Sequence, residues 1–201
     1  MDSKKIIYTI KGGDNNGWAL DQTLFYVKNA FGEKTNWIFS KSIRYADIVI
    51  FGWYNGFLEN RYLLNKNQIK KIIVKNNIDS IIHLAAVLSV GESERKPKKY
   101  KKINVEGTKI LLEAIKNTKV KNIIFSSTCA VYKDGITKVN EKTKLSPSSV
   151  YGYTKLQCEK MIKIFCKKNK LNYGILRYFN VAGASSTGKI GQINKGDQLF
   201  K

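Results

Sequence analysis

Histidine and cysteine are scarce in this chain of 201 residues, which holds one histidine, His83, and three cysteines. The cysteines are Cys129, Cys158 and Cys166, and no two of them form a CxxC pair. Zinc sites draw mainly on several histidine and cysteine ligands at short spacings, so the sequence predicts no metal site. Unpaired thiols are typical of a reducing compartment, and we expect a cytoplasmic protein.

Long hydrophobic runs are also missing. The apolar run over residues 6–10 is too short for the core of a signal peptide. No segment approaches the roughly 20 apolar residues of a membrane span. We therefore expect neither a leader nor membrane insertion. An apolar content of 43% is still enough for a hydrophobic core, and the length fits one domain, or one domain and a fragment.

Acidic residues are few, since 15 Asp and Glu stand against 36 Lys and Arg, for a formal net charge of +21. One interpretation is a polyanion partner, because clustered cations displace counterions from phosphates. The other is a solvated lysine-rich surface. We favour the second, because no helix-turn-helix, zinc-finger or RNA-stacking motif accompanies the charge. We expect no specific nucleic-acid binding, although a basic cleft would suit a nucleotide-like cofactor or substrate.

The composition changes near residue 60. Residues 1–60 hold 7 basic and 6 acidic residues, whereas residues 61–201 hold 29 and 9. All three tryptophans, Trp18, Trp37 and Trp53, precede this point. We interpret residues 1–60 as an atypical N-terminal βαβ-like segment of different origin from residues 61–201.

Apolar strands alternate with amphipathic helices along most of the chain. After residue 60, strands are predicted over 79–86, 121–128 and 171–181, and helices over 67–74, 100–117 and 151–168. Before it, strands are predicted over 5–10, 35–40 and 46–53, and a helix over 18–31. This alternation indicates an α/β fold with a Rossmann-like, doubly wound parallel sheet.

The turn over residues 12–17 (GGDNNG) follows the first predicted strand and is able to present amides to a phosphate. Its glycines do not have the GxGxxG spacing, so a flexible turn is the favoured interpretation. No acidic residue ends the strand over 35–40 to accept a hydrogen bond from a ribose 2′-hydroxyl. Lys41 and Arg44 stand there instead, which would suit a 2′-phosphate if this segment binds a dinucleotide, so NAD and NADP both stay open.

The most informative residues are Tyr151 and Lys155, four positions apart at the start of a predicted helix. Residues at this spacing share one helix face. A nearby ammonium lowers the pKa of a phenol from about 10 and makes it a useful acid or base. Thr128 ends one predicted strand, and Asn180 lies near the end of the next. The carboxyl ends of parallel strands share the edge of the sheet where ligands bind.

Each of these residues also has a plain structural interpretation. Tyr151 would pack its ring at a helix start, and Lys155 would be a surface lysine. Thr128 would satisfy a strand-end carbonyl, and Asn180 would cap a turn. Their order on a predicted parallel sheet nevertheless favours the catalytic interpretation. His83, within a predicted buried strand, is interpreted as a core histidine.

Several segments between about residues 65 and 192 resemble the extended short-chain dehydrogenases/reductases, and within them the NAD-dependent epimerases and dehydratases. The similarity is closest to the UDP-glucose 4-epimerases. In chain order the segments are IHLAA at 82–86, VGES at 90–93, KP at 96–97, NVEGT at 104–108, FSST at 125–128, SPSSVYGYTK at 146–155 and LRYFNVAGA at 176–184. On this resemblance, residues 61–201 are a partial NAD-dependent epimerase/dehydratase domain.

The resemblance implies NAD as the cofactor and a nucleotide sugar as the substrate. Tyr151 would be the acid/base, Lys155 would lower its pKa and bind the nicotinamide ribose, and Thr128 would bridge the sugar 4-hydroxyl. The implied cofactor-binding residues are Leu84, Ala85, Ala86, Val87, Leu88, Asn104, Lys155, Tyr178 and Phe179. The implied substrate-binding residues are Thr128, Tyr151 and Asn180. The implied reaction is a transient oxidation at C4 that interconverts UDP-glucose and UDP-galactose.

The chain departs from the family at both ends. Residues 1–60 lack its TGGxGxxG turn, and the segments over 17–22 and 46–50 instead faintly resemble the start of a bacterial glycosyltransferase. The family's C-terminal substrate-binding portion is not found beyond Gln192, so we expect a truncated fold with weak or absent epimerase activity. The alternatives are a non-catalytic fusion or remnant of an epimerase gene, and a basic polyanion-binding module. The family also implies a homodimer through the helices over 100–117 and 151–168.

Overall fold

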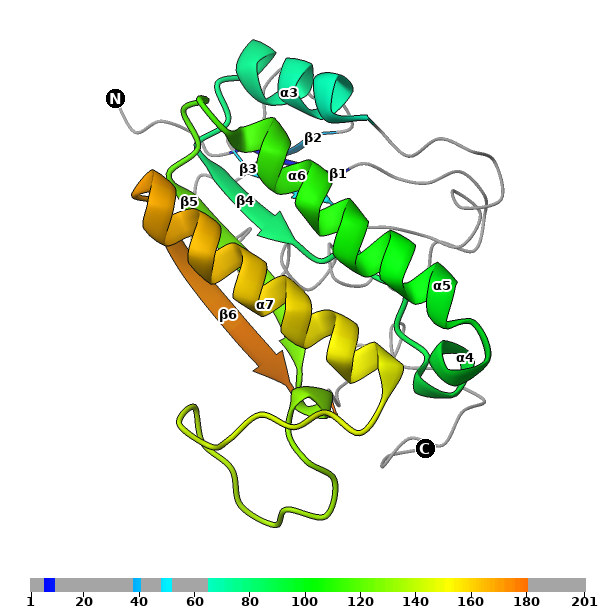
Figure 1. The fold of residues 1–201 in the computed structure, drawn as a ribbon. Helices are drawn as coiled ribbons and strands as arrows, with labels where there is room; N and C mark the ends of the chain where they lie inside the picture. Colours follow the sequence, from blue (N-terminus) through cyan, green and yellow to red (C-terminus); the bar gives the residue numbers. More distant parts are fainter. Residues whose placement is uncertain (1–5, 10–37, 41–47, 52–64, 181–201) are drawn as a thin grey trace, which may run out of the picture.

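A computed structural model describes residues 6–9, 38–40, 48–51 and 65–180 of the chain (Figure 1). Its strands form one six-stranded sheet in the order β2-β1-β3-β4-β5-β6, and all neighbours run parallel. The strands are β1 (Ile6–Thr9), β2 (Ile38–Ser40), β3 (Ile48–Phe51), β4 (Ser80–His83), β5 (Asn122–Thr128) and β6 (Asn172–Tyr178). The predicted α/β, Rossmann-like class is confirmed. The turn over 12–17, the helix over 18–31, Lys41 and Arg44 lie outside the described residues.

Three helices lie side by side across one face of this sheet, as Figure 1 shows for α3, α6 and α7. The described helical segments are α3 (Lys66–Lys75), α4 (Val90–Arg95), α5 (Pro97–Tyr100), η2 (Lys101–Glu106), α6 (Gly107–Ile115), η3 (Cys129–Val131) and α7 (Val150–Asn169). The predicted helix over 100–117 differs in its first third, where η2 is a π-helix. The Asn104 carbonyl in this segment accepts from the Thr108 hydroxyl at 2.6 Å.

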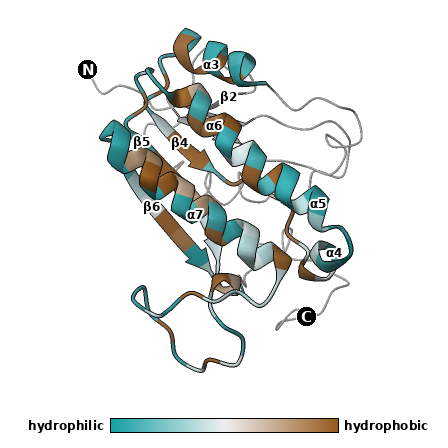
Figure 2. Cartoon of the chain, in the orientation of Figure 1, coloured by the Kyte–Doolittle hydropathy of each residue, from teal (hydrophilic) through white to brown (hydrophobic). Residues whose placement is uncertain are grey.

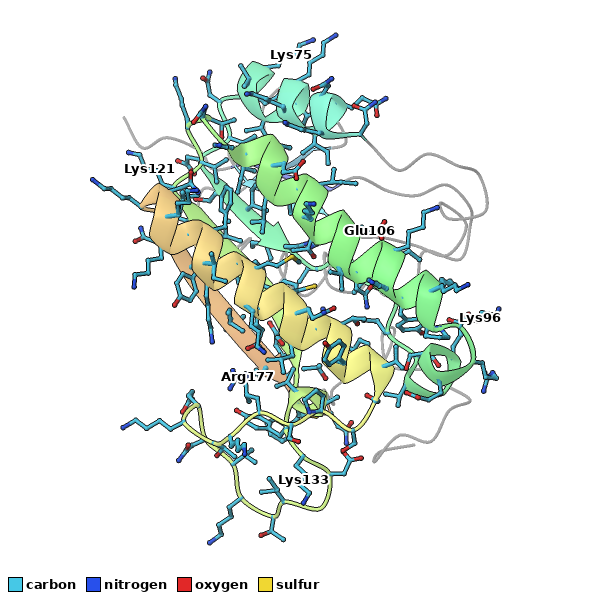
Figure 3. All side chains as sticks on the ribbon, viewed as in Figure 1. Lys75, Lys96, Glu106, Lys121, Lys133 and Arg177 are labelled. Atoms are coloured by element: carbon cyan, nitrogen blue, oxygen red, sulfur yellow. The ribbon has the colours of Figure 1, made fainter. Side chains whose placement is uncertain are left out.

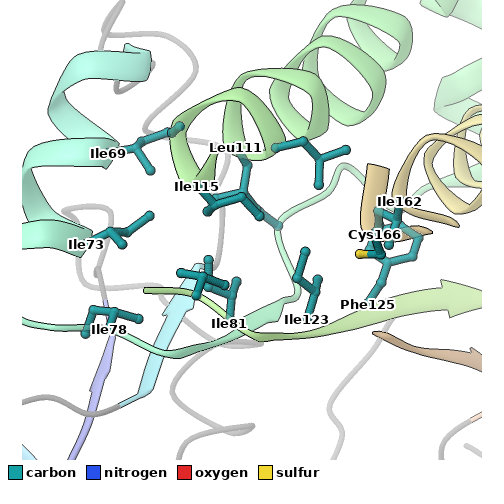
Figure 4. Close-up of a cluster of buried hydrophobic side chains, with 14 of the residues drawn as sticks. Ile69, Ile73, Ile78, Ile81, Leu111, Ile115, Ile123, Phe125, Ile162 and Cys166 are labelled. Atoms are coloured by element: carbon teal, nitrogen blue, oxygen red, sulfur yellow. The ribbon is translucent and has the colours of Figure 1, made fainter. Parts of the chain in front are cut away.

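The core forms where these helices meet β4 and β5. Figure 2 shows hydrophobic and hydrophilic residues alternating along α3, α6 and α7, as expected for amphipathic helices. Each fully buried aliphatic side chain contributes roughly 1.5–3 kcal/mol by leaving water. Figure 4 shows the cluster, which includes Ile69, Ile73, Ile78, Ile81, Leu111, Ile115, Ile123, Phe125, Ile162 and Cys166.

Many lysines lie on the outside of this fold, as Figure 3 shows for Lys75, Lys96, Lys121 and Lys133. Some have a local role, because Lys75 lies in the last turn of α3, and α7 ends with Lys167 and Lys168. Cations at helix C-termini interact favourably with the helix dipole. Part of the excess positive charge therefore stabilises helix ends.

His83 is buried at the end of β4, as predicted. Its Nε2 lies 2.9 Å from Thr108 Oγ1. Because the Thr108 hydroxyl donates to the Asn104 carbonyl, we assign the ring proton to Nε2. His83 Nδ1 then has no hydrogen-bond partner in the part of the chain that the structure describes. Burial, and after it the charge of Lys155, lowers the pKa of His83 to about 3.

We expect acid to destabilise the fold through His83. The unfolded chain binds a proton at His83 below about pH 6.5, whereas the folded chain stays neutral there until about pH 3, so stability is lost as the pH falls through this window. Between pH 7.5 and 5.0 the loss is about 2 kcal/mol in the free energy of unfolding, measured by urea titration. No other histidine is present. His83→Gln should remove this pH dependence, and an unchanged dependence in that variant would contradict the assignment.

Candidate active site

Three candidate side chains come from two elements that pack against each other. Thr128 ends β5, and Tyr151 and Lys155 lie in the first turns of α7. All three are buried, with 8%, 8% and 1% of their surface exposed, respectively. Lys155 is therefore not the surface lysine of the alternative interpretation. The Tyr151 ring does pack at a helix start, edge-on to Tyr100 with 6.5 Å between ring centroids.

The start of α7 is held by side chains from α4. Ser149 caps the helix by accepting from the Gly152 amide at 3.0 Å. The Val150 amide donates to Glu94 Oε1 at 2.8 Å, and the Tyr151 amide donates to Ser93 Oγ at 3.1 Å. Amides in a first helical turn have no partner within the helix, so each of these bonds satisfies an otherwise open donor. The VGES motif therefore contributes to fixing the backbone of Tyr151.

Gly152 allows α7 to approach the end of β5 closely. A Cβ atom at this position would lie 2.1 Å from the Ala130 carbonyl oxygen, which is far inside contact distance. No side chain fits there without moving backbone. The glycine in the YGYTK segment is thus required by the packing of α7 against η3.

The pKa of the Tyr151 phenol differs from the value that the sequence led us to expect. Burial raises its pKa, hydrogen bonding with the Thr128 side chain opposes this, and Cys129 adds to the rise. The pKa therefore lies above its ordinary value, although Lys155 was expected to lower it. The interaction with Thr128 does join the strand end to the phenol.

Lys155 is a buried cation whose ammonium lies 4.5 Å from the centroid of the Phe125 ring. Burial lowers its pKa to about 8, while Cys158 and Glu159 act in the opposite direction. No hydrogen-bond acceptor for its Nζ is found among the described residues. A desolvated ammonium without an acceptor gains from a ligand that brings oxygen atoms, and the ribose hydroxyls of a dinucleotide are such acceptors. The residue therefore fits the implied cofactor.

Asn104, in η2, holds the segment that follows β4. Its Oδ1 accepts from the Val87 amide at 2.9 Å, and its Nδ2 donates to the Val87 carbonyl at 3.2 Å and to Thr154 Oγ1 at 3.2 Å. Both backbone polar groups of Val87 are therefore engaged by Asn104. Of the other implied cofactor residues, Ala85 and Ala86 are buried, Leu84 is half-buried and Leu88 is 58% exposed.

The remaining candidates lie at the end of β6. Tyr178 is the register partner of Thr128, so both mark the same carboxyl edge of the sheet. Phe179 and Asn180 follow directly, beyond the strand, which ends at Tyr178 rather than at residue 181. Tyr178 is 44% and Phe179 is 60% exposed, and Asn180 is also exposed. These side chains are open to a ligand at this edge.

The described residues provide neither a metal-ligand cluster nor a membrane-spanning helix. Within the described ranges, no cluster of three or more histidine, cysteine or acidic residues is placed to hold a metal ion. In the same ranges, every helix is too short or too polar to cross a membrane.

A parallel Rossmann-like sheet with a buried tyrosine and lysine one helical turn apart at its carboxyl edge defines a protein of the short-chain dehydrogenase/reductase class. The match to known families is more specific. The model of the NAD dependent epimerase/dehydratase family matches residues 36–195, and the chain belongs to this family.

Relatives in the family include named 4-epimerases. The chain is 42% identical over 143 residues to a UDP-glucose 4-epimerase of Lactobacillus helveticus, which covers 70% of this chain and 41% of that protein. It is 40% identical over 131 residues to a probable UDP-arabinose 4-epimerase of Arabidopsis thaliana, with 63% and 31% covered. The crystal structure of the Brucella ovis UDP-glucose 4-epimerase in complex with NAD is similar, with a TM-score of 0.68, 28% identity, and 94% of this chain and 56% of that chain covered. The chain thus spans about half or less of these proteins.

We expect Gly152→Ala to destabilise the protein, because the added methyl group meets the Ala130 carbonyl and forces α7 away from β5. The free energy of unfolding should fall by roughly 1–3 kcal/mol in urea titrations. Gly174→Ala is the matched control, since its Cβ would lie at an ordinary 3.9 Å from Ile124 Cγ1. Equal losses in the two variants would show that close packing at residue 152 is not the cause.

Proposed function

We propose that this chain carries the cofactor and proton-transfer residues of a UDP-sugar 4-epimerase, which interconverts UDP-glucose and UDP-galactose through transient NAD-dependent oxidation at C4. The observation that carries the proposal is the buried Lys155 ammonium one turn from the buried Tyr151 phenol, which interacts with Thr128. Relatives named as UDP-glucose and UDP-arabinose 4-epimerases support C4 as the reacting position. We also propose that residues 61–201 form the catalytic unit and that residues 1–60 have a separate origin.

The proposed proton path runs from the sugar to Tyr151. NAD, when bound, accepts and returns the hydride at C4. The Tyr151 phenolate would take the proton of the 4-hydroxyl, and Thr128 would hydrogen-bond the same oxygen. Because burial alone raises the pKa of this phenol, the phenolate needs positive charge nearby. Lys155 and the cationic nicotinamide ring are the two proposed sources.

Cofactor and substrate would meet at the carboxyl edge. Lys155 would donate to the ribose hydroxyls, and Tyr178 and Phe179 would border the nicotinamide. Asn180 would contact the nucleotide sugar. Leu84, Ala85, Ala86 and Leu88 would line the cofactor, and Asn104 would hold their segment through Val87.

Tyr151→Phe should lower the kcat that this chain retains at least 100-fold, because it removes the acid/base, and should leave the Kd for NAD within about threefold. Lys155→Met should weaken NAD binding. Coupled assays of UDP-galactose formation and calorimetric titrations with NAD measure the two effects. Tyr153→Phe is the matched control, because Tyr153 lies on the same helix and is 55% exposed.

The alternatives give different outcomes in the same experiments. NAD binding without turnover in the unsubstituted chain would favour a non-catalytic remnant. Tight association with nucleic acid that weakens steeply with salt would favour a polyanion-binding module. An equal loss of kcat in Tyr151→Phe and Tyr153→Phe would contradict the role of Tyr151.

We further propose that the protein is a cytoplasmic homodimer that pairs through α6 and α7. These helices lie side by side, and α7 exposes Tyr153 and Ile164, at 55% and 70%. The two residues are eleven positions apart and so share one helix face. Exposed apolar residues on one face are typical of an interface.

Ile164→Lys should therefore shift the protein from dimer to monomer in light scattering coupled to size exclusion. Val74→Lys is the matched control, because Val74 is an exposed aliphatic residue (56%) on α3. A monomeric unsubstituted protein would contradict the proposed dimer.

A further inference from the structure

Glu159 is a buried carboxylate that the proposed reaction does not use. It lies on α7 with none of its surface exposed. It accepts from Ser127 Oγ at 2.6 Å, from Arg177 Nε at 3.0 Å and from Arg177 Nη2 at 2.8 Å. Lys163 is a more distant neighbour at 3.9 Å. Two parallel bonds from one guanidinium form the most directional ion pair available to proteins.

The partners of Glu159 stand next to the candidate site. Ser127 and Arg177 are register partners on β5 and β6. Ser127 directly precedes Thr128, and Arg177 directly precedes Tyr178. Glu159 itself follows Lys155 by one helical turn. One carboxylate thus joins the three elements that carry the site. Figure 3 labels Arg177, which extends from β6.

The same arginine reaches the connection between β5 and α7. Its Nη1 donates to the Tyr132 hydroxyl at 2.9 Å, and its Cζ lies 5.2 Å from the centroid of that ring. The Tyr132 hydroxyl donates in turn to the Asn140 carbonyl at 3.0 Å. The cluster therefore also orders the chain that leads into Tyr151.

The charge of Glu159 acts on Lys155. The titratable groups that influence this ammonium are Cys158 and Glu159 on α7, and Glu159 is the carboxylate among them. His83 on β4 also faces it but is neutral, and Phe125 on β5 offers only its ring. Burial acts to raise the pKa of Glu159, but the bonds from Arg177 and Ser127 outweigh it, so the pKa stays below its ordinary value. The carboxylate is therefore ionised at neutral pH.

We propose that Glu159 and Arg177 are positioning residues, whose ion pair fixes the ends of β5 and β6 against α7 and holds the Glu159 carboxylate one helical turn from the Lys155 ammonium. This inference rests on the proposed function for its role in catalysis. Its structural basis is the three hydrogen bonds on one buried carboxylate beside the site. A buried ion pair is no better than apolar packing at stabilising a fold, so its effect on Lys155 is the distinguishing property.

The test is a direct titration of Lys155 in four forms of the full chain: unsubstituted, Glu159→Gln, Arg177→Gln and the double variant. The ¹³Cε resonance of lysine reports protonation, and its loss in Lys155→Arg assigns it. The midpoint should be lower in Glu159→Gln and in the double variant than in the unsubstituted chain, because both variants lack the carboxylate that favours the protonated ammonium. We expect about 1 pH unit between the extremes, which is a tenfold change in the proton-binding constant. Equal Lys155 midpoints in the four forms would overturn the proposal, because an ion pair with a purely structural role does not change the protonation of Lys155.

Two further variants keep the test decisive. Glu113→Gln removes an exposed carboxylate on α6 and should leave the midpoint unchanged. If Glu159→Gln does not fold, Arg177→Gln carries the test alone, because it removes the partner of the Glu159 carboxylate. A shift of the Lys155 midpoint would support the proposal, and no shift would overturn it. Ser127→Ala removes one of the three bonds to Glu159 and should therefore lower kcat. Because it keeps both charges, it should leave the Lys155 midpoint and the Kd for NAD unchanged.

The titration needs no cofactor, so it separates this inference from the proposed function. Lys155 midpoints that differ as expected among the four forms, in a chain that binds no NAD, would reject the function and keep the effect of the ion pair on Lys155. NAD binding and turnover with equal Lys155 midpoints in all four forms would support the proposed function and reject the effect of the ion pair on Lys155.

Discussion

The burial of one ammonium group is the constraint on which the site depends. Lys155 is a buried residue of α7 whose ammonium lies over the Phe125 ring, and desolvation makes its charged form energetically unfavourable. A group in this state gains strongly from any oxygen ligand or carboxylate placed beside it. The core that α7 and β5 share therefore does more than stabilise the fold, because it keeps a cation ready for a polar ligand.

Rigid placement of α7 follows from contacts at several points along it. Its first amides are satisfied by Ser93 and Glu94 from α4, Gly152 allows its first turn to lie against the Ala130 carbonyl, and Glu159 is bonded to β5 and β6. Each contact joins the helix to a different element. Tyr151 and Lys155 lie between them, so neither can move without breaking a bond that is buried or charged. The family's reaction requires such fixed distances between a proton acceptor and the reacting carbon.

The electrostatics of the site come from a few buried groups, and the lysine-rich surface contributes little. Exposed lysines are screened by water and salt over about 10 Å. Inside, the Glu159 carboxylate acts on both Lys155 and Arg177 at low dielectric, where the same charges have larger effects. The net charge of +21 therefore says little about the chemistry at the carboxyl edge.

Local pattern in the sequence was enough to predict the parallel α/β fold, the end of β5 at Thr128 and the shared helix face of Tyr151 and Lys155, because the periods of helices and strands are properties of neighbouring residues. It was not enough for the π-helical turn at Asn104, the capping of α7 by Ser93 and Glu94, or the pairing of Glu159 with Ser127. It also gave the wrong direction for the pKa of Tyr151. These features join residues from about 20 to almost 60 positions apart, or depend on burial that is set by the whole fold. Only tertiary packing decides which distant groups meet and how far water is excluded from them.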